Sequence, residues 1–205
     1  MDLEEKTIDR QTVFKGHVVD VELQHVKTPQ GNTAVREIVR HAPAIALLVI
    51  DDDQKMILEK QWRSPVQNIT WEIPAGKLDE RDQGDARHAA VRELNEETRL
   101  KADKLTKITS FYSSVGFCDE FLTLYLAKGL KPVERALPQD QDEDIKLYRF
   151  SLEEALQMIA NGEIQDSKTI VAVYYWQAQT LAQKLKENNE KSADWSRKND
   201  APAVS

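Results

Sequence analysis

The sequence predicts a mixed α/β sandwich of the α+β type, in which a mixed sheet lies between helices. Extended patterns occupy residues from about 10 to 41, and a continuous apolar run over 44–50 is typical of a strand buried on both faces. The helical patterns begin only near residue 86, and further strand-like runs separate them. This order of elements favours a sandwich over a regular doubly wound fold.

The first part of the chain is predicted to consist of strands joined by turns. The sequence Pro-Gln-Gly-Asn at 29–32 is typical of a turn, and three consecutive aspartates at 51–53 favour a solvated hairpin turn. The strands predicted around these turns are 18–26, 34–40, 44–50 and 55–62.

Helices dominate the pattern after residue 85. A helix over 86–98 places Ala90, Val91, Leu94 and Thr98 on one face, which we expect to pack on the sheet. A capping box at Ser151 starts a short helix that ends near Gly162. The remaining predicted elements are strands at 105–112, 121–127 and 145–150 and an amphipathic helix at 167–186.

These elements predict three parts of the chain. Residues 1–41 are expected to form an N-terminal β extension, and residues 42–187 the main domain. The segment 188–205 is polar, so we expect it to be a disordered tail.

Composition excludes several classes of function. The 205 residues suffice for one well-buried domain, and the net charge of −7 argues against binding to the backbone of nucleic acid. A single cysteine, Cys118, excludes an internal disulfide framework and fits a reducing compartment. The acidic start does not resemble a secretory signal, and no apolar run approaches the roughly 20 residues that span a bilayer. We therefore expect a cytoplasmic protein that binds neither nucleic acid nor membrane.

The helix over 86–98 carries an acidic cluster. Glu93, Glu96 and Glu97 stand at positions i, i+3 and i+4, so they share one side of the helix. Like charges so placed destabilise a helix unless a cation neutralises them, and Mg²⁺ prefers carboxylate oxygens together with substrate phosphates. The cluster indicates metal-assisted phosphate chemistry.

At these residues the chain resembles the Nudix hydrolase family. The family box runs Gly, five residues, Glu, seven residues, then Arg-Glu-apolar-X-Glu-Glu-X-Gly-apolar. The second half matches from Arg92 to Leu100 except that Arg99 replaces Gly, where a helix-ending left-handed conformation is expected. In the first half, Asp82 follows Gly76 after five intervening residues in place of Glu, and the loop before the helix is two residues longer.

The flanks of the box resemble the ADP-ribose pyrophosphatase branch of that family. They are the sequences Trp-Glu-Ile-Pro-Ala-Gly at 71–76 and Ser-Ser-Val-Gly-Phe-Cys-Asp-Glu at 113–120. The resemblance implies a Nudix α/β/α sandwich and a homodimer in which the N-terminal strands help to build the partner's substrate site. It also implies water attack on one phosphorus of a pyrophosphate, assisted by Mg²⁺ or, in its place, Mn²⁺.

The resemblance assigns the metal site residue by residue. Glu93, Glu97 and the backbone carbonyl of Ala75 are expected to bind metal, and Glu96 is expected to bind metal or to position water. Arg92 would orient these carboxylates by ion pairing. The catalytic base is expected in the acidic run 140–144, where Glu143 is favoured and Asp142 comes second.

Five further positions correspond to substrate-binding residues of relatives. Arg36 and Arg63 would hold phosphate or ribose, because the guanidinium group suits bidentate phosphate recognition. Glu72 and Glu120 stand where relatives keep acidic residues near metal or ribose, and each of these four could instead form a structural ion pair. Trp62 could stack on an adenine, or it could serve packing.

The substrate predicted by this resemblance is ADP-ribose, cleaved to AMP and ribose 5-phosphate. The loop after the box has Val115 where many ADP-ribose pyrophosphatases have Pro, so other nucleoside diphosphate derivatives stay open, such as GDP-mannose or a dinucleoside polyphosphate. A non-catalytic nucleotide-binding sensor also remains possible, because the box departs from the family pattern.

Overall fold

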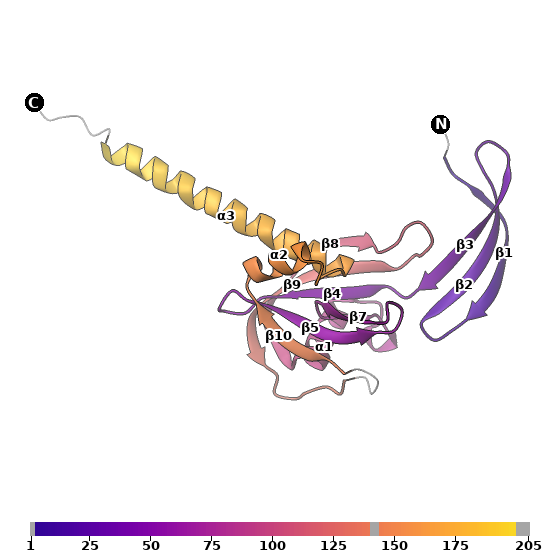
Figure 1. The fold of residues 1–205 in the computed structure, drawn as a ribbon, viewed down its shortest axis with the longest axis horizontal. Coiled ribbons are helices and arrows are strands. Elements are labelled where there is room, and N and C mark those ends of the chain that lie inside the picture. Colours follow the sequence, from indigo (N-terminus) through magenta and orange to yellow (C-terminus); the bar gives the residue numbers. More distant parts are fainter. Residues whose placement is uncertain (1–2, 140–143, 200–205) are drawn as a thin grey trace, which may run out of the picture.

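The computed structural model describes residues 3–139 and 144–199, and for residues 192–199 it describes the backbone alone. Within these residues the strands form three separate sheets, and helices cover two sides of the central one (Figure 1).

The central sheet has four strands in the order β7-β4-β9-β8. The pair β4–β9 is parallel, whereas β4–β7 and β8–β9 are antiparallel, so the sheet is mixed as predicted. Its strands are β4 (Ala44–Val49), β7 (Ala75–Lys77), β8 (Leu100–Tyr112) and β9 (Phe121–Pro132).

A second, antiparallel sheet has the order β10-β5-β6. Its strands are β5 (Met56–Arg63), β6 (Asn68–Glu72) and β10 (Lys146–Phe150). Strand β6 leads through Ile73 and Pro74 into β7 of the central sheet. This connection places the Trp-Glu-Ile-Pro-Ala-Gly segment where the two sheets meet.

Strand β4 separates two apolar clusters, which makes it buried on both faces as predicted. Ala46 and Leu48 belong to one cluster, and Ile45 and Leu47 belong to the other, because successive side chains point to opposite faces of a strand. Each fully buried Leu or Ile side chain contributes about 1.5–3 kcal/mol.

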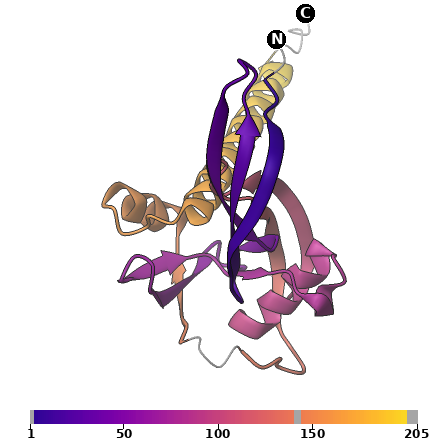
Figure 2. The ribbon, with the colours of Figure 1, turned by 90° about the vertical axis from the view of Figure 1, so that its right-hand side faces the viewer.

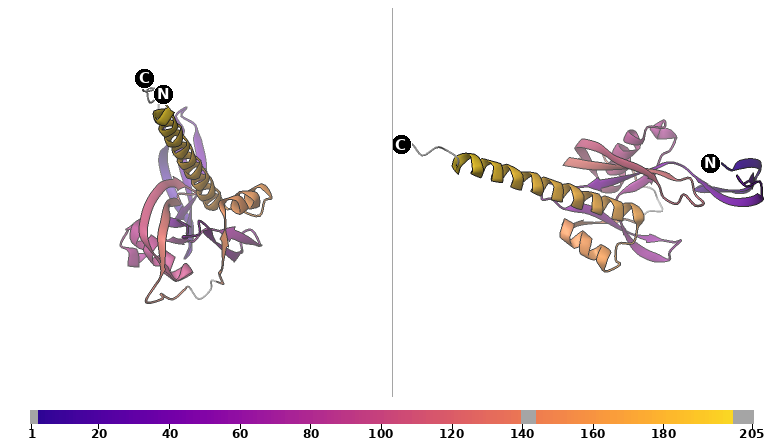
Figure 3. Two further views of the ribbon diagram at one scale, coloured as in Figure 1. Left: turned by 90° about the vertical axis from the view of Figure 1, so that its left-hand side faces the viewer. Right: turned by 90° about the horizontal axis from the view of Figure 1, so that it is seen from above.

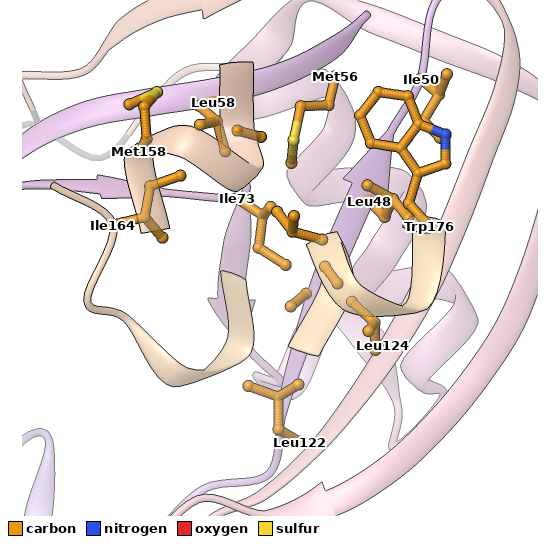
Figure 4. Packing of buried hydrophobic residues seen from close by; sticks show 14 of the residues in the cluster. Leu48, Ile50, Met56, Leu58, Ile73, Leu122, Leu124, Met158, Ile164 and Trp176 are labelled. Carbon is orange, nitrogen blue, oxygen red and sulfur yellow. The ribbon is translucent and has the colours of Figure 1, made fainter. Parts of the chain in front are cut away.

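Different helices cover the two faces of this sheet. The cluster around Leu48 packs on α2 (Leu152–Ala160) and α3 (Ser167–Asn199), as Trp176 and Met158 show in Figure 4. The cluster around Ile45 packs on α1 (Ala86–Thr98). The molecule is therefore an α/β/α sandwich, as the sequence predicted.

Two expectations for the helices are corrected. Val91 is 51% exposed, whereas its neighbours Ala90 and Leu94 are buried, so the packing face of α1 is narrower than expected. Helix α3 continues to Asn199, so the backbone of 188–199, predicted to be disordered, is helical. Residues 188–199 contain no Pro and include Lys, Glu and Ala residues, which are compatible with a helix, so their polar character did not prevent helix formation. In Figure 3 this end of α3 extends away from the sheets.

The N-terminal residues form the predicted β extension. Strands β1 (Lys6–Lys15), β2 (Val19–Lys27) and β3 (Thr33–His41) make an antiparallel sheet that stands apart from the body of the molecule (Figure 1). In Figure 2 this sheet lies in front of the body. Every residue of β1 is exposed. No helix among the described residues is long and apolar enough to cross a membrane.

Candidate active site

Helix α1 carries the acidic cluster on a side that faces protein rather than solvent. The side chain of Asp85 accepts from the backbone N–H of Arg87 and so caps the start of the helix. The helix ends at Arg99, which takes the left-handed conformation usual for the box Gly, with φ 61°. The guanidinium of Arg99 also donates to the carbonyl of Leu137, a contact that the sequence did not reveal.

Arg92 is the centre of the ion-pair network in this helix. Its side chain is only 7% exposed, and its Nη1 donates to Glu93 Oε1 and to Glu96 Oε2, both at 2.7 Å. Burial lowers the pKa of the guanidinium, but the hydrogen bond to Asp82 and the nearby glutamates outweigh it and raise the pKa. Arg92 therefore stays charged and fixes the direction of two carboxylates.

Asp82 holds the other side of the same guanidinium. Its carboxylate accepts from Arg92 Nε at 3.0 Å and from Nη2 at 2.7 Å, and its side chain is fully buried. The hydrogen bond from Arg92 lowers the pKa of Asp82 well below its usual range. Asp82 thus supplies a carboxylate partner for Arg92 although it is one methylene shorter than the Glu of the family box.

The lengthened loop before α1 is ordered by its own capping box. Residues Glu80–Asp82 form the short 3₁₀ helix η1, whose N-cap Asp79 accepts from the backbone of Arg81. Asp82 in turn accepts from the backbone N–H of Asp79 at 3.0 Å. Gln83 and Gly84 then take positive φ values of 52° and 78°, which turn the chain into α1.

The turn at residues 75–76 lies directly against the glutamates. The backbone N–H of Ala75 donates to Glu97 Oε2 at 3.1 Å. A Cβ atom at Gly76 would overlap the Glu93 carboxylate, so only glycine allows this approach. The positions of Glu93 and Glu97 therefore depend on Ala75 and Gly76, although Ala75 and Glu97 are 22 residues apart in the chain.

These residues fit a divalent cation. The carboxylates of Glu93, Glu96 and Glu97 and the carbonyl of Ala75 are hard oxygen donors, the type that Mg²⁺ and Mn²⁺ prefer. In residues 3–139 and 144–199 no three acidic, His or Cys side chains are already arranged around a metal position. Glu93 and Glu96 are both paired with Arg92.

A cleft of about 890 Å³ opens beside this cluster. Six of the residues that the sequence singled out line the cleft. They are Trp62, Arg63, Ala75, Arg92, Glu93 and Glu120. The cleft brings the end of β5, the turn at 75–76, helix α1 and the start of α3 together, so Arg63 and Lys168 line the same cleft as Glu93.

Glu72 lies beneath the cleft wall rather than in it. Its side chain is 4% exposed and accepts from Arg63 Nε at 2.7 Å and from Lys168 Nζ at 2.5 Å. Burial raises the pKa of Glu72, but the hydrogen bond from Arg63 and the charge of Lys168 outweigh it and lower the pKa to about 2. Glu72 thus forms the structural ion pairs that the sequence left open, and its contacts hold Arg63 and Lys168 in the wall. Its expected role near metal or ribose stays a prediction.

Three lining cations were missed in the sequence, namely Lys77, Arg81 and Lys168. Lys168 lies in the first turn of α3 and pairs with Asp166 at 3.1 Å as well as with Glu72. Arg81 lies in η1 and pairs with Glu96 at 3.1 Å. Neither Lys168 nor Arg81 follows a recognisable pattern in the chain, because each reaches the cleft only through the packing of its element.

The remaining predicted residues are distributed differently. Arg36 pairs with Glu5 inside the N-terminal sheet and is not in the cleft of its own chain. Glu120 lies 3.5 Å from the Nδ1 atom of His41, another lining residue. Asp142 and Glu143 lie outside the described residues. The next residue, Asp144, lines the cleft.

Comparison with known proteins agrees with this geometry. A NUDIX domain model matches residues 40–173. The ADP-ribose pyrophosphatase of Bacillus subtilis (strain 168) is 41% identical over 184 residues, which cover 90% of this chain and 98% of that protein. The methanol dehydrogenase activator of Bacillus methanolicus is 44% identical over 176 residues, covering 86% and 94%.

A solved structure supports the fold. The crystal structure of an ADP compounds hydrolase matches with a TM-score of 0.77 at 19% identity and covers 89% of this chain and 98% of that one. The NUDIX domain match and the 41% identity to the Bacillus subtilis protein confirm the family predicted from the sequence. The chain belongs to the Nudix hydrolase family.

Proposed function

We propose that this chain hydrolyses the pyrophosphate bond of a nucleoside diphosphate sugar, and that ADP-ribose is its substrate. The products would be AMP and ribose 5-phosphate. The observation that carries the proposal is the set of three glutamates on one side of α1, set beside a cleft that also contains Arg63 and Lys168. The 41% identity to the Bacillus subtilis ADP-ribose pyrophosphatase supports the choice of substrate.

A divalent cation is part of this proposal, with Mg²⁺ preferred and Mn²⁺ as a substitute. Glu93, Glu96, Glu97 and the carbonyl of Ala75 would hold it. When bound, the cation would polarise the pyrophosphate and lower the pKa of a coordinated water.

The protein side chains would position the reacting groups. Arg92 fixes the carboxylates of Glu93 and Glu96, and Arg63 would bind phosphate oxygens while Glu72 holds it from beneath. Trp62 lies exposed at the cleft and is available for stacking on the base.

The bond changes follow from this arrangement. The oxygen of a water molecule forms a bond to one phosphorus, and the bridging P–O bond breaks, so the electron pair leaves with the other phosphate. A carboxylate must take the proton of the water, and Glu143, followed by Asp142, remains the proposed base. The position of Asp144 in the cleft lining supports placing the base in this run.

A hydrolysis screen tests the proposal. Purified protein is incubated with Mg²⁺ and ADP-ribose, ADP-glucose, GDP-mannose, NADH or diadenosine polyphosphates, and the products are separated by chromatography. We expect ADP-ribose to be cleaved fastest, with activity lost on chelation. Faster cleavage of GDP-mannose or a dinucleoside polyphosphate would keep the reaction and reassign the substrate.

Matched variants test the site. Glu97→Gln should reduce turnover by at least about 100-fold without unfolding the protein, because it removes an anionic donor. The control is Glu190→Gln, an exposed residue of α3 outside the cleft. If wild-type protein binds ADP-ribose in calorimetry but cleaves none of the compounds, the chain is a nucleotide-binding sensor and the proposal fails.

The N-terminal sheet supports a homodimer as part of the proposal. Ile8, Val13 and Phe14 of β1 are exposed apolar residues on a sheet that stands apart from the body, and a second copy would cover them. In that assembly Arg36 would reach the partner's cleft. Light scattering after size exclusion should give twice the chain mass, and a monomer would remove Arg36 from the proposed site.

A second candidate function follows from the 44% identity to the methanol dehydrogenase activator. The chain would then act on a methanol dehydrogenase through the same hydrolytic site. Dehydrogenase turnover measured with wild-type protein and with Glu97→Gln tests this, since activation by wild type alone links it to hydrolysis. No change in turnover with either protein would exclude the role for that dehydrogenase.

A further inference from the structure

The lengthened loop of the Nudix box places an arginine on the acidic cluster. Arg81 Nη1 donates to Glu96 Oε1 at 3.1 Å, while the other oxygen of that carboxylate accepts from Arg92. Glu96 is one of the proposed metal ligands. Both of its oxygens are therefore engaged by guanidinium groups.

Arg81 also covers Glu96 on the side of the cleft. Arg81 is among the residues that line the cleft, whereas Glu96 is not, and the side chain of Glu96 is 8% exposed. A cation that binds Glu96 Oε1 would meet the guanidinium of Arg81 at the same oxygen. The two would compete for the same oxygen, because a guanidinium and a metal ion need the same lone pairs.

The two arginines differ in how firmly they are held. Arg92 is buried and bonded to three carboxylates, and removing such a partner from a buried network is strongly unfavourable. The side chain of Arg81 is 55% exposed, and exposed ion pairs are weak. Arg81 is therefore the partner of Glu96 that can leave.

Arg81 has a second carboxylate partner, Asp79, which would still balance its charge after the bond to Glu96 breaks. Its Nε donates to Asp79 Oδ2 at 2.7 Å, and its Nη2 lies 2.5 Å from the same oxygen. Asp79 itself is held as the N-cap of η1. When the bond to Glu96 breaks, the guanidinium retains this carboxylate.

We propose that Arg81 is an exchangeable counter-ion of Glu96, which a divalent cation must displace to bind the α1 glutamates. The inference rests on the proposed metal site and concerns how tightly that site binds. It also gives the irregular first half of the box a role, because η1 presents Arg81 to Glu96. In this chain the loop would weaken metal binding and thereby set the cation concentration at which the site fills.

Mn²⁺ binding to the protein without substrate tests the inference. The signal of free Mn²⁺ in electron paramagnetic resonance is measured at fixed ionic strength for wild type and for Arg81→Gln. We expect the variant to bind about two- to fivefold more tightly, the range that one exposed ion pair represents. Arg81→Lys should give a smaller change, because it keeps a positive charge.

Arg87→Gln is the matched control. Arg87 lies in the first turn of α1, is exposed, and donates to the carbonyl of Leu105 rather than to a cleft carboxylate. Its Mn²⁺ affinity should equal that of wild type. The cap of η1 uses the backbone of Arg81 and survives the substitution, which a thermal melt of Arg81→Gln checks.

The outcomes separate the inference from the proposed function. Tighter binding in Arg81→Gln alone supports it. Unchanged or weaker binding in that variant, with clear binding by wild type, refutes the inference and leaves the metal site intact. Absence of Mn²⁺ binding in wild type and all variants overturns both the metal site and the inference.

Discussion

Replacing Glu72 by Gln tests how the wall of the cleft is held together. Glu72 accepts four hydrogen bonds, from two atoms of Arg63, from Lys168 and from the hydroxyl of Thr70. Gln keeps the size of the side chain but removes its charge, so the cations of Arg63 and Lys168 lose their shared anion. It also turns an N–H donor group toward donors, which leaves buried polar atoms unsatisfied.

The pKa of Glu72 supplies the magnitude. The pKa falls from its ordinary value of 4.5 to about 2 in the folded protein. A difference of about 2.5 units corresponds to about 3 kcal/mol of folding free energy at neutral pH. Because the folded pKa is the lower one, this stabilisation is complete above about pH 4.5 and is lost as pH falls through about 2.

Urea denaturation at several pH values measures this effect. At pH 7 we expect Glu72→Gln to unfold with about 3 kcal/mol less free energy than wild type, and the difference should fall below half of that by pH 3. Glu190→Gln, an exposed carboxylate of α3, should match wild type at neutral pH. A difference under about 1 kcal/mol at pH 7, or one that does not change with pH, would refute the reasoning.

Three further substitutions probe other features. Gly76→Ala should abolish metal-dependent hydrolysis, because the added Cβ displaces the Glu93 carboxylate. The thermal melt should stay cooperative. Retained turnover would show that the turn at 75–76 can shift to make room for the Cβ. Arg99→Gly relieves the strain of a left-handed conformation but removes the hydrogen bond to the Leu137 carbonyl. The free energy of unfolding in urea should therefore change by less than about 1 kcal/mol. A larger loss would show that the hydrogen bond to Leu137 outweighs the relief of strain. Leu124→Ala should lower the unfolding free energy by about 2–5 kcal/mol in urea, because the side chain is fully buried in the core of Figure 4, and a loss under 1 kcal/mol would show that the core collapses around the cavity.

The sequence alone determined the fold class and the acidic platform. The apolar run at 44–50 predicted a strand buried on both faces, and the structure confirms it because helices cover both sides of β4. The spacing of Glu93, Glu96 and Glu97 predicted one acidic helix side, since a helix repeats every 3.6 residues whatever surrounds it. Both features depend only on residues that are close in the chain, so a short stretch of sequence is enough to predict them.

The short strands β6 and β7 were less visible in the sequence. Strand β7 has only three residues, and β6 ends in a buried glutamate. Strand β7 is too short to show the alternation that identifies a half-buried strand, and β6 shows it over five residues only, so their pairing with β4 and β5 defines them. The length of α3 was underestimated for a similar reason, because a polar pattern does not distinguish a solvated helix from an unstructured segment.

Only the tertiary structure decided which charges meet. Lys168 and Glu72 are separated by 96 residues in the chain yet form one buried pair, and Arg81 reaches Glu96 across 15 residues through the turn of η1. Electrostatic interactions act over a few ångströms of space without regard to sequence separation, so no local pattern encodes them. The sequence therefore determined which residues could do the chemistry, and the packing of β6, η1 and α3 determined which of them face the cleft and which hold the others in place.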